Sequence, residues 1–300
     1  MSRRHASAQE LWVCDLGTVR YPDALAAQQR IRERRQRGEL PDTLLLLEHP
    51  PVYTLGHRAE QRELPFSEDF YRERGIEIHA CDRGGRITYH GPGQLVGYPI
   101  LAVEDVLEYV RALERSIIGA LARCGVSARS RTEEGPDYTG VWVAERKIAS
   151  IGVHLQRTVT THGFAVNLCN DLEPFSWVVA CGLPDVTMTS LARELEASAA
   201  HRASPPPSAA QLARRFRSAI VASLGHALGL TPRAVPAAQL GLESLPHAQL
   251  GLESLPHGQL GTPSLPTAQL GPHTAHASRP AATRAPLSSA AAHTARTVTA

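Results

Sequence analysis

The residue best placed for nucleophilic chemistry in this chain is a cysteine. Cys181 follows an apolar stretch and precedes a glycine and a proline, an order typical of an exposed turn. A thiolate is a strong nucleophile once a neighbouring group has taken the proton of the thiol. Free cysteines are more often buried packing residues, and Cys81 and Cys169 are rivals on local grounds. Spacing alone leaves the choice among the three open.

The balance of basic residue types suggests which residue could activate such a thiol. The chain carries 30 arginines and a single lysine, Lys147. Arginine stays charged at any working pH, so it cannot shuttle a proton, whereas lysine can. The apolar neighbours Ala149 and Ile151 favour a neutral amine, because a lysine over apolar surface loses hydration. The alternative is that this lysine has no catalytic role and stands at a surface turn by chance. Histidine is the more usual activator, and the candidates are His90, His154 and His162.

A glycine-rich stretch, residues 83–94, predicts a ligand-binding loop. Its glycines and a proline surround the β-favouring triplet 87–89, which indicates a loop, a short strand and a turn. Glycine allows close approach of the backbone and positive φ. Bare N–H groups beside Arg83, Arg86 and His90 suit an oxygen-rich or extended ligand. An ordinary pair of tight turns is the alternative.

Short strands separated by a few helices must position these residues. Apolar alternation and apolar runs predict strands at 11–14, 43–48, 52–55, 76–80, 87–89, 95–101, 126–130, 140–144, 147–153 and 162–168. Helical spacing and capping residues predict helices at 22–37, 106–124, 189–199 and 208–228. The order of these elements predicts an α/β (α+β) fold, with a mixed β-sheet flanked by helices.

The composition divides the 300 residues at about Thr231. Residues 1–230 are ample for one domain with a sizeable core. After them the chain is almost uncharged, and the ten-residue unit 238–247 recurs at 248–257. Each unit holds a proline and a glycine, which oppose helix. We therefore expect residues 231–300 to be a low-complexity, disordered tail.

Charge and cysteine usage limit the classes of partner. The chain has 31 basic and 29 acidic residues, and the small excess lies after Thr231, so the region before it is formally neutral. This balance argues against a nucleic-acid partner. The five cysteines are odd in number and form no Cys-x-x-Cys, and no secretory signal opens the chain, which favours free thiols in the cytoplasm. No apolar run approaches the length of a membrane span, so no membrane partner is expected.

Taken together, the motifs resemble those of the lipoyl(octanoyl) transferase family of lipoate biosynthesis. Four motifs in the family's order carry the likeness across about residues 11–228: RGG and TYHGPGQ within 83–94, KIASIG at 147–152, HGFAVN at 162–167 and ACG at 180–182. Together these motifs are far more specific than any one of them. The repetitive tail has no counterpart in the family pattern.

The resemblance implies a concrete activity. Members of the family transfer an octanoyl group from octanoyl-acyl carrier protein to a lysine of lipoyl domains, those of the 2-oxoacid dehydrogenase complexes and of the glycine cleavage H protein. The likeness implies Cys181 as the nucleophile that holds the acyl group as a thioester, and Lys147 as the general acid/base. It also implies a fold like that of the biotin and lipoate protein ligases, with no ATP, other cofactor or metal. The implied substrate-binding residues are Arg83, Gly84, Gly85, Arg86, Ile87, Thr88, Tyr89, His90, Ser150, Ile151, Gly152, Gly163, Phe164 and Ala165.

Three other functions fit parts of the pattern. An ATP-dependent lipoate or biotin protein ligase of the same fold would consume ATP and would need no cysteine. A cysteine hydrolase would release free octanoate. A non-catalytic module that sequesters acyl carrier protein would bind without turnover.

Overall fold

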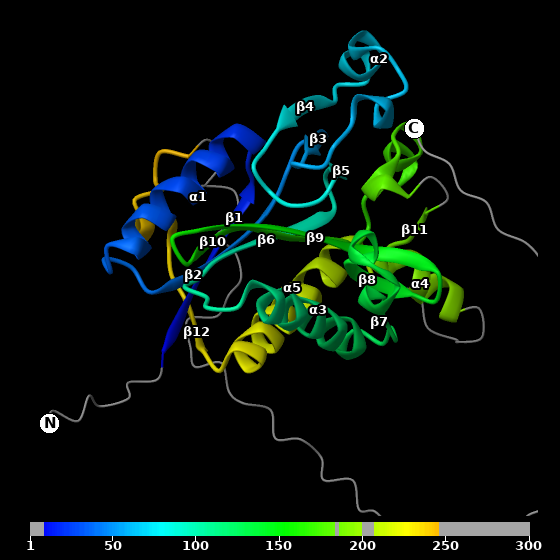
Figure 1. The fold of residues 1–300 in the computed structure, drawn as a ribbon. Coiled ribbons are helices and arrows are strands. Elements are labelled where there is room, and N and C mark those ends of the chain that lie inside the picture. Colours follow the sequence, from blue (N-terminus) through cyan, green and yellow to red (C-terminus); the bar gives the residue numbers. More distant parts are fainter. Residues whose placement is uncertain (1–8, 184–185, 200–206, 246–300) are drawn as a thin grey trace, which may run out of the picture. The chain divides into compact units, whose positions relative to one another are not determined.

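A mixed β-sheet forms the centre of the chain (Figure 1). The computed structural model describes residues 9–183, 186–199 and 207–245, with the side chains of Cys181 and Ala199 excepted. In this part of the chain nine strands pair in the order β12-β1-β2-β6-β10-β9-β8-β7, and β11 lies beside β9. The strands are β1 Glu10–Thr18, β2 Asp42–Glu48, β6 Gln94–Ile100, β7 Arg129–Ser130, β8 Gly140–Val143, β9 Arg146–Gln156, β10 Val159–Asn167, β11 Thr187–Met188 and β12 Thr231–Ala234.

The neighbours of this sheet run in both directions. β1 is parallel to β2 and to β12, whereas β2, β6, β10, β9, β8 and β7 pair antiparallel in turn. The hairpin of β9 and β10 contributes the longest ladder, from Val159–Gln156 to Val166–Ala149. This arrangement confirms the predicted α/β class with a mixed sheet.

Helices cover both faces of the sheet. α3 (Val106–Arg123) and α5 (Ala209–Leu228) pack on one face together with α4 (Leu191–Ala199), and α1 (Tyr21–Gln36) packs on the other. In β2, Leu44 and Leu46 face α3 and α5, while Leu45 and Leu47 face α1. The continuous apolar run is therefore buried on both sides, as the sequence predicts.

The helix ends follow local chemistry. Asp105 caps α3, because its carboxylate accepts hydrogen bonds from the N–H groups of Leu107 and Glu108. Ser208 and Gln211 form a capping box at the start of α5, which ends at Gly229 with φ of 65°. Among the described residues, no helix combines the length and the apolar character that a bilayer crossing requires.

A second, smaller sheet carries the glycine-rich stretch. β3 (Val52–Leu55) pairs with β4 (Glu77–Ala80) and with β5 (Ile87–His90). A short helix that the sequence patterns did not predict, α2 (Glu68–Glu73), precedes β4 and is capped by the Ser67 hydroxyl. The rings of Tyr53, Tyr71 and Phe175 form the core of this part.

The ordered fold extends past the boundary expected at residue 230. β12 adds to the edge of the main sheet by pairing with β1, and a 3₁₀ helix follows at Ala237–Leu240. Leu240, Leu242 and Leu245 are buried beside α1. Residues 231–245 therefore belong to the folded part, because these apolar side chains complete the core on that face. The rest of the predicted tail, 246–300, lies outside the described residues.

Candidate active site

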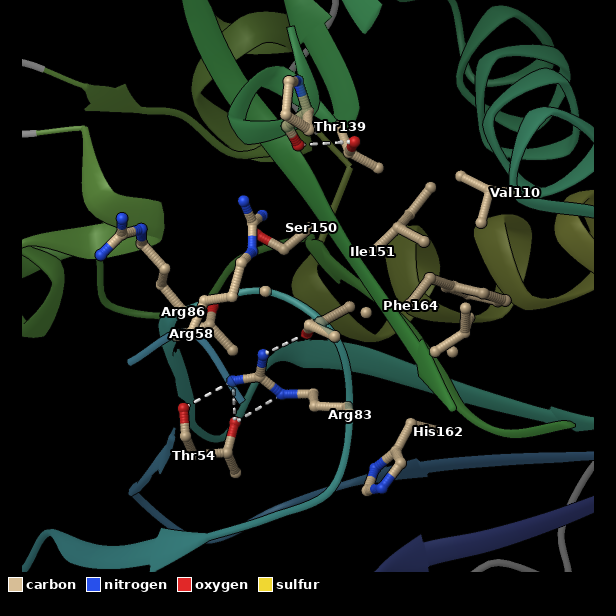
Figure 2. Close-up of a pocket in the computed structure, with 18 of the residues that line it drawn as sticks. Thr54, Arg58, Arg83, Arg86, Val110, Thr139, Ser150, Ile151, His162 and Phe164 are labelled. Carbon is tan, nitrogen blue, oxygen red and sulfur yellow. Dashed lines mark hydrogen bonds between the residues drawn. The ribbon is translucent and has the colours of Figure 1, made fainter. Parts of the chain in front are cut away.

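A cavity of about 480 Å³ lies where the glycine-rich stretch meets β9, β10 and α3 (Figure 2). This volume falls within the range typical of small-ligand sites. Its wall includes nearly all of the predicted acyl-site residues: Arg83, Gly84, Gly85, Arg86, Ile87, Thr88, His90, Ser150, Ile151, Gly152, Gly163, Phe164 and Ala165. Lys147 lines it as well. Sequence segments far apart in the chain thus meet at one place, and their roles there remain predictions.

The cavity has a polar side and an apolar side. Figure 2 shows Arg58, Arg86 and Ser150 on one side, and Val110, Ile151 and Phe164 on the other. Val110 of α3 lines the cavity. A ligand with a polar head and a hydrocarbon chain matches this division.

Tyr89 is the predicted acyl-site residue that does not line the cavity. Alternate residues of a strand point to opposite faces, so Tyr89 points away from Thr88 and His90. Its ring packs against Tyr53 and Phe175 in the core of the smaller sheet. The expectation that Tyr89 contacts an acyl group is therefore corrected: this side chain anchors β5 instead.

The glycine-rich stretch lies directly on the backbone of β9. The N–H of Gly84 donates to the Val153 carbonyl at 2.9 Å. A Cβ atom at Gly152 would lie 2.8 Å from the Gly84 carbonyl oxygen, closer than real Cβ contacts allow. A glycine is therefore needed at position 152, where these backbones meet, and this contact forms one wall of the cavity.

Arg83 holds this loop rather than offering its charge to a ligand. Its side chain is buried, and its guanidinium donates to the Thr54 carbonyl, the Thr54 hydroxyl and the Gly84 carbonyl. Figure 2 shows the bonds from Arg83 to Thr54. Arg83 lines the cavity, but its hydrogen bonds go to Thr54 and Gly84, and the expected contact with an oxygen-rich ligand stays a prediction.

A chain of hydrogen bonds continues from Thr54 through the protein interior. Neutral His90 accepts from the Thr54 hydroxyl at 3.3 Å and donates from Nδ1 to the Gln94 side-chain oxygen at 2.8 Å. The Gln94 amide donates to the Asn167 side-chain oxygen at 2.9 Å. Burial lowers the pKa of His90 well below its usual value, as does the nearby His49. His90 is therefore neutral, and both of its ring nitrogens are hydrogen-bonded within the protein.

The same series of hydrogen bonds reaches the segment that carries Lys147. The Asn167 amide donates to the Thr189 carbonyl at 3.0 Å, and the Thr189 N–H donates to the Lys147 carbonyl at 2.9 Å. The sequence indicated Asn167 only as part of a motif and gave no signal for Thr189. Fully bonded buried networks of this kind fix backbone positions closely.

His162 is held by Asp82 at the edge of the cavity. Its Nε2 lies 2.7 Å from an Asp82 carboxylate oxygen, and its backbone has φ of 57°. The left-handed backbone is uncommon for a residue with a side chain and turns this ring toward Asp82. The hydrogen bond from His162 lowers the pKa of Asp82 to about 2, while burial lowers the pKa of His162.

Lys147 lines the cavity and is almost fully buried, with 1% of its surface exposed. Its Nζ is 5.2 Å from the centre of the Trp142 ring, and the guanidinium of Arg131 is 4.6 Å from the same ring. Lys147 pairs with Trp142 in the ladder, whereas Val141 pairs with Ala149, so Ile148 is an extra residue on β9. Such a bulge redirects side chains, and bulges are frequent beside active sites.

The cysteines differ clearly in their surroundings. The backbone of Cys181 lies in the 3₁₀ helix Ala180–Gly182, and the position of its thiol lies outside what the structure describes. The Cys81 thiol donates to the Leu55 carbonyl at 3.3 Å, and burial raises the pKa of the Cys169 thiol. Neither Cys81 nor Cys169 is among the residues that line the cavity, and the choice of Cys181 over them stays a prediction.

A buried histidine beside this network predicts loss of stability in acid. His49 donates from Nδ1 to the Val19 carbonyl and accepts from the Tyr98 hydroxyl, and burial lowers its pKa to about 4. Between its usual pKa of about 6.5 and about 4, the unfolded chain binds a proton that the folded chain does not. Stability is therefore lost as the pH falls through this window, by ~2–3 kcal/mol from His49 alone.

Urea unfolding at about pH 7 and about pH 5 measures this loss. A His49→Gln variant is expected to be less stable at both pH values but less sensitive to pH. A variant of the exposed His226, His226→Gln, serves as the control and should keep the wild-type pH dependence. Equal pH sensitivity of wild type and His49→Gln would contradict the assignment.

Comparison with known proteins identifies the family. The model of the lipoyl protein ligase A/B catalytic domain matches residues 20–219. An octanoyltransferase of Acidobacterium capsulatum is 44% identical in an alignment of 197 residues, gaps included, that covers 60% of this chain and 78% of the relative. An octanoyltransferase of Solibacter usitatus is 48% identical in an alignment of 182 residues that covers 59% of this chain and 81% of the relative. The chain belongs to the lipoyl protein ligase A/B catalytic-domain family.

Solved structures agree with this membership at the level of the fold. A bipartite lipoate protein ligase of Thermoplasma acidophilum superposes with a TM-score of 0.58 at 16% identity, over 78% of this chain and 90% of that one. The predicted likeness to lipoate protein ligases is thus confirmed. Within the lipoyl protein ligase A/B family, the identity to octanoyltransferases makes this chain an acyltransferase.

Proposed function

We propose that this enzyme transfers an octanoyl group from octanoyl-acyl carrier protein to a specific lysine of lipoyl domains, through a thioester on Cys181. The similar proteins of Acidobacterium and Solibacter are named octanoyltransferases, which supports the choice of acyl group. The observation that carries the proposal is that the chain's single lysine lies buried in the wall of a cavity with an apolar side.

The apolar side of the cavity suits a medium-length acyl chain. Val110, Ile151 and Phe164 form this side. Each methylene removed from water contributes about 0.8 kcal/mol, so seven carbons beyond the carbonyl would contribute about 6 kcal/mol. This binding energy holds the carbonyl carbon near the polar side, where the reaction takes place.

The first half-reaction would load the enzyme. The Lys147 amine takes the proton of the Cys181 thiol, and the thiolate attacks the carbonyl carbon of the donor thioester. The carbon–sulfur bond to the carrier then breaks, and Lys147 returns the proton to the departing sulfur. One thioester replaces another, so the step needs no nucleotide.

The second half-reaction would deliver the acyl group. The amine of the acceptor lysine attacks the carbonyl carbon held on Cys181 and gives up a proton through Lys147. The bond to Cys181 breaks, and an amide forms, which is more stable than the thioester. Backbone N–H groups near Gly152 or Gly182 are the proposed donors to the oxyanion in both steps.

Intact-mass spectrometry tests the proposal directly. Wild-type enzyme incubated with octanoyl-acyl carrier protein should gain the mass of one octanoyl group and lose it when a lipoyl domain is added. An ATP-dependent ligase is the second candidate, because the fold is shared with a lipoate protein ligase. Transfer that requires free octanoate and ATP, with no acyl-enzyme at any time, would favour that candidate instead.

The depth of the cavity predicts selectivity for chain length. Val110 on α3 borders the apolar side, so Val110→Trp should shorten the space for the acyl chain. We expect octanoyl transfer to fall by at least about tenfold while transfer of a four-carbon chain changes little, since each lost methylene contact costs about fourfold. Competition between the two acyl donors measures the ratio. Leu155→Trp, an exposed position of β9 away from the cavity, is the control.

A further inference from the structure

Arg86 connects the glycine-rich stretch to the turn that carries Cys181. It lies directly before β5 and also borders the cavity. Its Nη1 donates to Glu60 at 2.8 Å and to Glu63 at 2.6 Å. The Glu63 side chain is almost completely buried, at 4% exposed, whereas the Arg86 side chain is 21% exposed. Two carboxylates on one guanidinium nitrogen fix the position of the side chain.

The anchored side chain lies against the residue after the cysteine. A Cβ atom at Gly182 would be 2.2 Å from Cδ of Arg86 and 2.5 Å from its Nε. The backbone of Gly182 has φ of 72°, a conformation that glycine adopts without cost. Arg86 therefore packs on the bare backbone of this turn. Its Nε is buried and has no hydrogen-bond partner among the described residues, so packing rather than hydrogen bonding sets this contact.

Glu63 also holds the backbone segment that leads into the turn at Cys181 and Gly182. The Glu63 carbonyl accepts a hydrogen bond from the Val179 N–H at 2.9 Å. Glu60 and Glu63 also bond to each other's backbones across the 3₁₀ helix Gln61–Glu63. Both ends of the segment around Cys181 thus rest on one unit, formed by Glu60, Glu63 and Arg86.

We propose that Arg86 is a positioning residue: held by Glu60 and Glu63, it fixes the turn at Gly182 and thereby the approach of the Cys181 sulfur to the acyl carbonyl. This inference rests on the proposed function of Cys181. It assigns Arg86 a role other than the contact with the acyl group implied by the sequence motif. A displacement of about 1 Å at a reacting atom can cost about a hundredfold in rate.

The test measures acyl-enzyme formation in a single turnover. Arg86→Met removes the guanidinium but leaves Glu63 buried and unpaired, which can destabilise the fold. The double variant Arg86→Met, Glu63→Gln removes both charges and keeps the space filled. We expect this double variant to acylate about tenfold to a hundredfold more slowly, with the donor KM changed by less than about twofold. Its pH profile of acylation should keep the wild-type shape at reduced height.

Matched controls distinguish a positioning role from an electrostatic role of Arg86. Arg72→Met removes an arginine from an exposed ion pair with Asp69 on α2 and should acylate at the wild-type rate. A double variant that acylates as fast as wild type would overturn the inference and leave the proposed function intact. A shifted pH profile would assign Arg86 an electrostatic role instead and also overturn it. A wild-type enzyme that forms no acyl-enzyme would overturn both proposals.

Discussion

A Lys147→Arg variant is expected to lose octanoyl transfer by about a thousandfold or more in kcat/KM. Arginine keeps the positive charge of lysine, but its guanidinium stays protonated at every working pH and cannot accept the thiol proton. Lys147 lies in the cavity wall beside Trp142, with 1% of its surface exposed, so bulk water cannot easily replace it as a base. Steady-state transfer to a lipoyl domain measures the loss.

A second variant decides what the lysine contributes. Lys147→Met removes both the charge and the base, and we expect it to be as inactive as Lys147→Arg. Full activity of Lys147→Arg beside an inactive Lys147→Met would show that a cation is sufficient, and proton transfer by Lys147 would have to be abandoned. Circular dichroism and thermal unfolding check that each variant is folded, because arginine is longer than the side chain it replaces in this buried place.

Replacing Cys181 by serine should have the largest effect of all. The hydroxyl of serine is a far weaker acid than a thiol, so an amine cannot generate its anion at neutral pH. We expect transfer to fall by about a thousandfold or more, with no octanoyl group retained on the enzyme after incubation with the donor. Rapid-quench measurement of acyl-enzyme together with intact mass records both results.

The matched control for this variant is another cysteine. Cys169→Ser replaces a thiol that does not line the cavity and should transfer at close to the wild-type rate. A Cys181→Ser enzyme that still transfers octanoyl groups at the wild-type rate would exclude a thioester on this residue. Loss of activity in Cys169→Ser with a normal Cys181→Ser would move the nucleophile to Cys169.

Local patterns predicted the elements of the fold well where one interaction decides the outcome. The run of leucines in β2 can only be a strand buried on both faces, and the structure has it so. Asp105 begins α3 because its carboxylate satisfies the first free N–H groups of that helix. α2 was missed because it has only six residues and depends on contacts with the aromatic core of the smaller sheet.

Roles at the site were harder to predict than positions. The motif placed Arg83 correctly, but only the structure reveals that its donors are occupied by Thr54 and Gly84. Tyr89 belongs to the same motif and faces the opposite way, since a strand alternates its side chains. The boundary at residue 230 missed the three buried leucines up to Leu245, because a repeat-like sequence gives no sign that its first part covers an open core face.

The burial of Lys147 affects whether the enzyme can be acylated on its own lysine side chains. An octanoyl thioester reacts with amines, and the proposed acceptor is a lysine on another protein. This chain has no other lysine, and Lys147 exposes only 1% of its surface. Its exterior therefore offers almost no lysine side chain that could capture an activated fatty group held by another molecule of the same enzyme.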